Sequence, residues 1–217
     1  MTIKCMDIPY NYIAIEGNIG AGKTTLATRL SKQFDTRIIL EQFEDNSFLP
    51  KFYEDPARYA FPLELSFLAD RFQQLKSQVA IQDMFHPITI ADYFILKSLI
   101  FAKKTLNGEE FALYSRLFSI IENVLPKPDL LVYLYLDISR LQSNIRNRGR
   151  IYEQKIEDEY LQKIQEGYLD YIRQQQGLRV LLIDTNKLDF VARQEDYEKL
   201  TSIITREYPI GIHRITP

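Results

Sequence analysis

The sequence predicts an α/β fold in which a parallel sheet of about five strands is covered by helices on both faces. Three observations lead to this prediction. Short apolar runs alternate with longer helical stretches, one run carries no charge over seven residues, and a glycine-rich turn joins the first run to a helix. With 217 residues, of which 46% are hydrophobic and 26% charged, the chain has the length and composition of a single folded domain.

Strands are predicted where the chain has short runs rich in isoleucine, leucine, valine and tyrosine. The run at residues 130–136 is the clearest, because a strand buried on both faces of a parallel sheet carries no charge. The predicted strands lie at residues 12–16, 37–40, 88–91, 130–136 and 179–183. Residues 208–217 are predicted to form a tail, which leaves a core of about residues 11–207.

Helices are predicted between these strands, because the intervening stretches are long enough and patterned for helix. A polar loop through Pro50 precedes the second helix, and Asn107-Gly108 separates two helical stretches after the third strand. The remaining predicted helices span residues 25–34, 57–81, 139–146, 157–175 and 194–206. Strands spaced by helices in this way are typical of βαβ units.

Composition excludes several classes of protein. Lys and Arg total 27 and Asp and Glu total 29, so no overall basic field predicts binding to a nucleic-acid polymer. Cys5 is the only cysteine, which excludes a disulfide framework and a cysteine-based zinc site and suits a reducing compartment. The N-terminus has no signal-peptide pattern, and no apolar run approaches the roughly 18 residues of a membrane helix. We therefore expect a cytoplasmic protein that binds no membrane.

Residues 17–24, Gly-Asn-Ile-Gly-Ala-Gly-Lys-Thr, match the pattern G-x-x-x-x-G-K-[ST] of a P-loop, between a strand and a helix. Backbone N–H groups of such a loop converge on phosphate oxygens, Lys23 adds charge at the β- and γ-phosphates, and the Thr24 hydroxyl can bind Mg²⁺. The sequence thus predicts the three-layer fold of a P-loop NTPase that binds ATP and Mg²⁺. The expected nucleotide contacts are Gly17, Asn18, Ile19, Gly20, Ala21, Gly22, Lys23, Thr24 and Thr25.

Residues 186–189, Asn-Lys-Leu-Asp, match the N-K-x-D pattern with which GTPases read guanine. No glycine in the chain has an aspartate three residues before it, so the D-x-x-G switch element of those proteins is absent. This disfavours a GTPase. We interpret the segment as a loop whose backbone touches a nucleotide base, with Asp189 and Phe190 as the expected contacts.

Two further segments suggest catalytic groups. Glu41 follows the second predicted strand, at the sheet edge where open α/β folds bind ligands. Its position alone leaves open whether it is a general base or a solvated loop carboxylate. The loop with Arg148 and Arg150 is expected to form a short arginine-rich lid that neutralises charge on a transferring phosphoryl group. Tyr93 and Phe94 are the aromatic pair expected to stack on a base.

These features together resemble the deoxyribonucleoside kinase family, and most of all its bacterial deoxyguanosine/deoxyadenosine kinase branch. The segments that carry the resemblance are residues 13–25, 48–56, 90–93, 101–102 and 148–150. They are spread over a region from about residue 13 to residue 200. The resemblance implies transfer of the γ-phosphoryl group of ATP to the 5′-OH of a purine deoxynucleoside, for DNA-precursor salvage, by a homodimer.

The resemblance also implies roles for individual residues. The general base of the family falls on Glu41. The groups that hold the sugar 3′-OH fall on Tyr53 and Glu153. The lid's earlier arginine falls on Asn144, so that role is either lost or taken by Arg146.

The glutamine with which the family reads the base falls on Glu64, and an arginine two turns further falls on Arg71. Their spacing places both on one helix face. A carboxylate can accept from guanine N1–H and N2–H₂ together, whereas adenine offers one donor beside an acceptor nitrogen. Glu64 therefore favours deoxyguanosine, and deoxyadenosine is possible. Arg71 either donates to guanine O6 or neutralises Glu64 and Asp92 in a structural cluster.

The sequence departs most from the family at the acid-Arg-Ser motif. This motif reads Ala91-Asp92-Tyr93 here, and Lys97 stands where an aspartate is usual. Either Asp92 is the acid of the motif and helps Thr24 to hold Mg²⁺, or Asp92 occupies the arginine site and pairs with Lys97. We expect Asp92, Tyr93 and Lys97 to bind substrate. The same Ala-Asp-Tyr in the purine-specific branch favours purines.

Two other functions remain as alternatives. A nucleoside monophosphate kinase of thymidylate-kinase type needs a basic contact for the phosphate of its acceptor. The expected acceptor side is rich in carboxylates instead. A P-loop GTP-binding regulatory protein is disfavoured by the missing D-x-x-G element.

Overall fold

The computed structural model describes residues 8–42, 46–79, 86–150, 153–154 and 156–217. The described residues group into two compact units. The first unit draws on the described residues within the ranges 8–40, 86–93 and 128–217, and it carries the β-sheet. The second unit draws on the described residues within the ranges 41–79 and 94–127, and its regular elements are helices.

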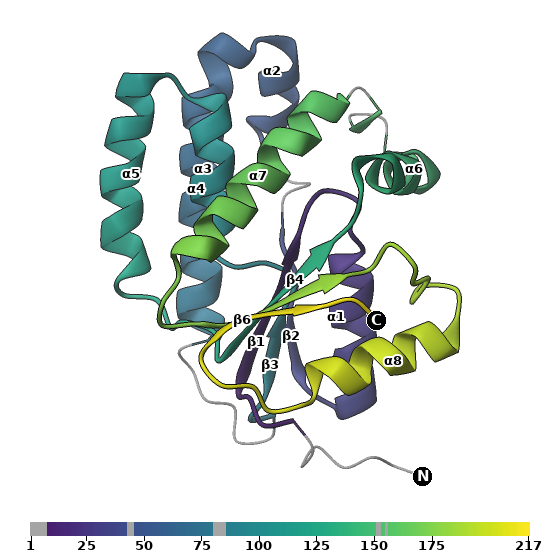
Figure 1. Cartoon of the computed structure of the whole chain (residues 1–217). Helices are drawn as coiled ribbons and strands as arrows, with labels where there is room; N and C mark the ends of the chain where they lie inside the picture. Colours follow the sequence, from purple (N-terminus) through teal and green to yellow (C-terminus); the bar gives the residue numbers. More distant parts are fainter. Residues whose placement is uncertain (1–7, 43–45, 80–85, 151–152, 155) are drawn as a thin grey trace. The chain divides into compact units, whose positions relative to one another are not determined.

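The first unit is built on a six-stranded sheet in the order β2-β3-β1-β4-β5-β6, in which every neighbouring pair is parallel (Figure 1). The strands are β1 (Tyr12–Gly17), β2 (Arg37–Ile39), β3 (Thr89–Ala91), β4 (Leu130–Tyr135), β5 (Arg179–Asp184) and β6 (Gly211–Ile215). The predicted α/β fold with a parallel sheet is confirmed. The chain builds β2 and β3 on one side of β1 and then β4 to β6 on the other, a change of direction that creates a ligand-binding crevice in open α/β sheets.

The sheet has six strands rather than five because residues predicted as a tail supply β6. This strand lies at the edge of the sheet, with half-buried and exposed residues alternating along it. An edge strand needs no continuous apolar run, so the pattern that identifies the central strands is missing from this segment.

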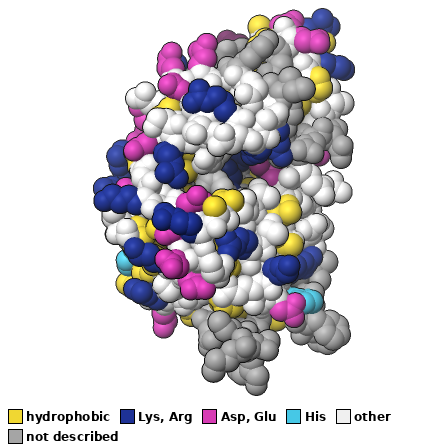
Figure 2. All heavy atoms as spheres, turned by 90° about the vertical axis from the view of Figure 1, so that its right-hand side faces the viewer, with side chains coloured by type: hydrophobic (Ala, Val, Ile, Leu, Met, Phe, Trp, Pro, Cys, Tyr) yellow, Lys and Arg dark blue, Asp and Glu magenta, His cyan; other side chains and the backbone are white. Residues whose placement is uncertain are grey.

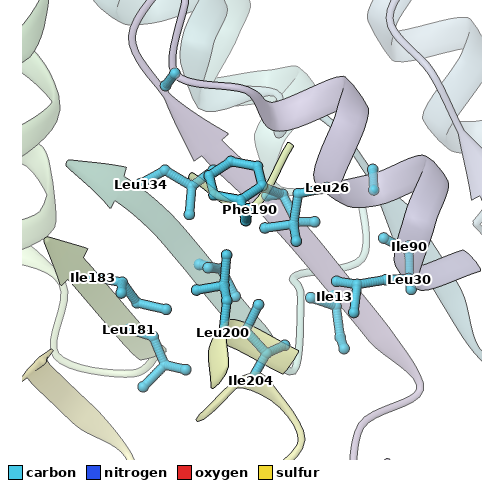
Figure 3. Packing of buried hydrophobic residues seen from close by; sticks show 14 of the residues in the cluster. Ile13, Leu26, Leu30, Ile90, Leu134, Leu181, Ile183, Phe190, Leu200 and Ile204 are labelled. Atoms are coloured by element: carbon cyan, nitrogen blue, oxygen red, sulfur yellow. The ribbon is translucent and has the colours of Figure 1, made fainter. Parts of the chain in front are cut away.

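Helices α1 (Lys23–Phe34) and α8 (Gln194–Ile204) cover one face of this sheet (Figure 1). Because side chains alternate along a strand, Ile13 and Ile15 of β1 point to this face. Figure 3 shows the resulting core, in which Leu26 and Leu30 of α1 pack with side chains from the strands and from α8.

The other face of β1 carries Ala14 and Glu16. The buried carboxylate of Glu16 accepts a hydrogen bond of 2.8 Å from the Tyr168 hydroxyl of α7 (Asp158–Gln174). The Tyr168 ring packs against that of Tyr133 on β4, with 5.3 Å between the centroids. The helices on opposite faces give the predicted three layers.

The second unit consists of α2 (Leu49–Glu54), α3 (Pro56–Gln78), α4 (Leu96–Thr105) and α5 (Gly108–Glu122). Asn107 separates α4 from α5 as predicted, and it caps α5 in a capping box with Glu110. The short helix α2 was not predicted, since the sequence there reads as a polar loop. Among the described helices, none combines the length and the apolar composition of a membrane span.

Helices α3 and α4 run antiparallel within the second unit. Arg71 of α3 bonds to Ser98 of α4, and Glu64, seven residues before Arg71, bonds to Thr105, seven residues after Ser98. This confirms the prediction that Glu64 and Arg71 share one helix face, and α4 is the element against which that face packs.

Candidate functional site

The loop between β1 and α1 has the backbone geometry of a phosphate-binding loop. Gly20 and Gly22 have φ angles of 84° and 87°, in the left-handed region that favours glycine. A Cβ at Gly20 would lie 2.8 Å from the carbonyl oxygen of Leu141, and one at Gly22 would lie 2.7 Å from the ring of Phe190. Both positions therefore require glycine for conformation and for space.

Two asparagines fix this loop in the first unit. The Asn144 amide in α6 (Ile138–Arg148) donates to the carbonyl of Gly20 at 2.8 Å, and that of Asn18 donates to Leu161 at 2.7 Å. Asn144 occupies the position of the family's earlier lid arginine, and here it anchors the loop. The side chain of Arg146 is exposed.

The Lys23 ammonium lies over the loop and donates to the carbonyl oxygens of Gly17 and Asn18, both at 2.9 Å. Lys23 and Thr24 belong to the first turn of α1, where backbone N–H groups lack partners within the helix. No side chain caps this helix. Loop, lysine and helix N-terminus therefore offer the donors that a chain of phosphates needs.

The Thr24 hydroxyl donates to Asp92, which directly follows β3, with 2.6 Å between Oγ1 and Oδ2. A hydroxyl oxygen beside a carboxylate oxygen is a donor set that Mg²⁺ prefers. The described residues contain no cluster of three or more acidic, His or Cys side chains that could hold a metal by itself. Mg²⁺ takes one or two protein ligands and completes its shell with phosphates and water.

In the lid region, Arg148 and Arg150 both form ion pairs with Glu153, the latter at 3.4 Å. The Glu153 side chain is 8% exposed, whereas those of Arg148 and Arg150 are 38% and 29% exposed. The structure thus brings together the two predicted lid arginines and one of the predicted sugar-binding residues.

A second cluster lies in the helical unit around Glu41. Arg71 donates to Glu41 Oε1 through Nε at 3.0 Å and through Nη2 at 2.7 Å, and Lys97 Nζ donates to Glu41 Oε2. A third group of Arg71, Nη1, donates to the Ser98 hydroxyl at 2.7 Å. The Glu41 side chain is only 8% exposed, so the interpretation as a solvated loop carboxylate is wrong.

The charges around Glu41 determine its protonation state. Burial raises the pKa of a carboxyl, but Lys97 and Arg71 outweigh it and lower the pKa of Glu41 to about 2. Glu41 is therefore ionised throughout the neutral range, and it can accept a hydrogen bond or a proton.

Glu64 differs from Glu41 although it lies in the same unit. Burial raises its pKa to about 7, and the hydrogen bond of 2.8 Å from the Thr105 hydroxyl offsets only part of that rise. The ion pair of Arg71 is with Glu41, and the positive charge of Arg71 also lowers the pKa of Glu64, by less than burial raises it.

Replacement of Glu64 by glutamine should make folding stability less dependent on pH. A carboxyl whose pKa is raised from 4.5 to about 7 holds a proton in the folded state that the unfolded chain releases, so stability falls as pH rises between these values. We expect the stability of Glu64→Gln relative to wild type to increase from pH 4.5 to pH 8 by up to about 3 kcal/mol. Urea unfolding at several pH values measures this. The exposed Glu109→Gln is the control, and a constant difference for Glu64→Gln would contradict the assignment.

The remaining predicted site residues lie in the protein core, in a turn or outside the described residues. Tyr93 and Phe94 are 0% and 2% exposed, and their stacking on a base stays a prediction. The Phe190 ring is part of the hydrophobic core (Figure 3), and it is the ring that a Cβ at Gly22 would meet. Asp189 accepts a hydrogen bond of 3.0 Å from the backbone of Ala192 and shapes its own turn. The Tyr53 side chain lies outside what the structure describes.

Lys97, which the sequence analysis placed among the substrate-binding residues, donates to Glu41, a partner 56 residues away in the chain that the sequence does not suggest. The roles of Ser98, Thr105 and Asn144 as hydrogen-bond partners were missed as well. Ser98 and Thr105 are seven residues apart, as are Glu64 and Arg71. This equal spacing is a signal in the sequence that one face of α3 can pair with one face of α4.

On the face shown in Figure 2, Lys and Arg side chains lie interspersed with Asp and Glu side chains. This agrees with the net charge of −2 of the whole chain.

Comparison with known proteins agrees with this geometry. A family profile described as deoxynucleoside kinase matches residues 13–208. The chain is 40% identical to the deoxyguanosine kinase of Bacillus subtilis (strain 168), over 88% of this chain and 94% of the relative. It is 32% identical to the deoxyadenosine kinase of Dictyostelium discoideum, over 91% of this chain and 79% of that one. A solved structure of deoxyadenosine kinase from M. mycoides with bound dATP superposes with a TM-score of 0.76 at 25% identity, covering 90% of this chain and 100% of that one.

Proposed function

The chain belongs to the deoxynucleoside kinase family, and we propose that it uses ATP to phosphorylate the 5′-OH of purine deoxynucleosides, with deoxyguanosine preferred. The observation that carries the proposal is the Glu41 carboxylate, held ionised by Arg71 and Lys97 in a chain that also has a P-loop. A hydroxyl acceptor needs such a hydrogen-bond acceptor, whereas a phosphate acceptor needs a cation that is not already neutralised.

We assign the phosphate donor to the first unit. The loop amides and Lys23 bind the phosphates of ATP, because they supply convergent N–H groups and a positive charge. Thr24 and Asp92 would hold Mg²⁺, which when bound neutralises charge on the phosphates. The contact between Thr24 and Asp92 supports the first of the two alternatives for Asp92, in which it is the acid of the motif. The positive charges of Arg148 and Arg150 stabilise the negative charge of the transferring phosphoryl group.

We assign the acceptor to Glu41. The 5′-oxygen of the nucleoside bonds to the γ-phosphorus, the bond from that phosphorus to the β,γ-bridging oxygen breaks, and ADP leaves with the electron pair. The hydroxyl proton passes to the Glu41 carboxylate. A base with a pKa of about 2 takes the proton late, which suits phosphoryl transfer because its loose transition state needs a well-placed hydroxyl more than a strong base.

The preference between purines is assigned to Glu64. Ionised, it accepts from N1–H and N2–H₂ of guanine, and donors of this kind stabilise the charged form. Protonated, it can donate to adenine N1 and accept from the adenine amino group, as the family's glutamine would. Three N–H groups of Arg71 are engaged by Glu41 and Ser98, so the predicted hydrogen bond from Arg71 to guanine O6 forms no part of this proposal.

The Glu64→Gln variant tests the assignment. Hydrogen bonds to a charged group contribute about 1.5–3 kcal/mol each, so the preference for deoxyguanosine over deoxyadenosine should be at least about tenfold in wild type and largely lost in Glu64→Gln. The measurement is kcat/KM for both nucleosides in both proteins, at pH 8 where wild-type Glu64 is mostly ionised. A wild type that prefers deoxyadenosine, or a ratio that the substitution leaves unchanged, would remove Glu64 from this role.

The alternatives fit less well. The curated relatives act on nucleosides by their names, and the cations Arg71 and Lys97 are already paired with Glu41, which disfavours a nucleoside monophosphate kinase. A cytoplasmic location, pairing into a homodimer and a role in DNA-precursor salvage stay predictions.

A further inference from the structure

Lys97 has a partner that its place in the sequence does not predict. Its ammonium donates to Glu41 Oε2, whereas both bonds from Arg71 go to Oε1. The two oxygens of one carboxylate are therefore held by two cations, Arg71 from α3 and Lys97 from α4.

This ion pair differs from a surface pair in its environment. The side chains of Lys97 and Glu41 are 13% and 8% exposed. Lys97 Nζ also lies 5.3 Å from the ring centroid of Phe101, one turn along the same helix. A buried charge is costly unless it is paired, and a pair away from water keeps its geometry more firmly than an exposed pair. Lys103 and Lys104 of α4, by contrast, are exposed.

We propose that Lys97 is a positioning residue for phosphoryl transfer, which together with Arg71 fixes the orientation of the Glu41 carboxylate. The inference rests on the proposed function, in which Glu41 accepts the proton of the 5′-OH. It assigns Lys97 to the orientation of Glu41, the catalytic base, rather than to contact with the nucleoside.

The geometry divides the restraint on the carboxylate between the two cations. Both donors of Arg71 meet Oε1, so they restrain this oxygen directly, whereas rotation of the carboxylate plane moves Oε2. The Lys97 contact to Oε2 opposes that rotation. A misplacement of about 1 Å at a reacting group can cost about 100-fold in rate, so this restraint is large enough to matter.

The test compares Lys97→Met with Lys97→Arg, and uses Lys104→Met on the same helix as the matched control. Lys97→Met should lower kcat about 10–100-fold with little change in KM for deoxyguanosine, because the nucleoside contacts are kept. Lys97→Arg keeps the cation and should recover most of the lost kcat. Lys104→Met should behave as wild type. Arg71 still pairs with Glu41 in Lys97→Met, so the fold should persist. Lys97→Gln, which keeps a donor for Oε2, serves as the second uncharged variant.

A double-mutant cycle with Glu41→Gln decides whether Lys97 acts through Glu41. In the Glu41→Gln background, Lys97→Met should lower kcat by less than about twofold further. A raised KM at unchanged kcat would overturn the inference, and so would effects of the two substitutions that multiply independently. If Glu41→Gln itself retains wild-type kcat, the proposed base is wrong and the inference falls with it. If only Lys97→Met is silent, the inference fails alone.

Discussion

Replacement of Glu41 by glutamine is expected to lower kcat by about 10²–10⁴-fold, the usual cost of losing a general base. Glutamine keeps the shape of the side chain but cannot take the proton of the 5′-OH. The KM for the nucleoside should change little, because the sugar and base contacts are elsewhere. Steady-state kinetics with ATP and deoxyguanosine measure both quantities. A variant within a factor of a few of wild type in kcat would remove Glu41 from the role of base.

The fold of this variant needs its own control, because Glu41→Gln leaves the cations of Arg71 and Lys97 without their carboxylate. The double variant Glu41→Gln/Lys97→Met removes one negative and one positive charge together, so it should be closer to wild type in thermal stability while remaining as inactive as Glu41→Gln. The exposed Glu109→Gln should leave both activity and stability unchanged. Activity that returned with stability in the double variant would show that the loss in Glu41→Gln was structural.

Replacement of Lys23 by alanine is expected to abolish turnover, with a loss of at least about 10³-fold. The substitution removes the positive charge that stabilises the negative charge of the transferring phosphoryl group. In this structure the ammonium bonds to the carbonyls of Gly17 and Asn18 rather than filling space in the core, so circular dichroism should show an intact fold. Lys32→Ala, at an exposed position of the same helix, is the control and should retain wild-type activity. Near-normal turnover in Lys23→Ala would make the P-loop assignment wrong.

The parts of the fold that follow from local pattern were predictable. The strand over residues 130–136 has a continuous apolar sequence because both of its faces are covered, and the P-loop sequence specifies its own left-handed glycines. The edge strand β6 and the helix α2 have no such signal. The former is half-exposed, and the latter is six residues long and begins next to a proline.

The candidate site was predictable as a set of residues but less so as a set of contacts. Glu41, Glu64 and Arg71 were identified by resemblance, and the structure gives them different electrostatic surroundings. Which cation pairs with which carboxylate depends on how α3 packs on α4, and this is a tertiary property. The same holds for Lys97. Its position in the sequence suggests Asp92 as its partner, but in the structure it pairs with Glu41.

The most direct test of the central claim is a transfer assay with γ-labelled ATP, MgCl₂ and a panel of acceptors. The panel contains deoxyguanosine, deoxyadenosine, deoxycytidine, thymidine and the corresponding monophosphates, and a parallel reaction contains labelled GTP with no acceptor. The account predicts that label appears in deoxyguanosine 5′-monophosphate first, in deoxyadenosine 5′-monophosphate more slowly, and in no diphosphate. Label that is transferred only to a monophosphate, or released from GTP without an acceptor, would contradict it.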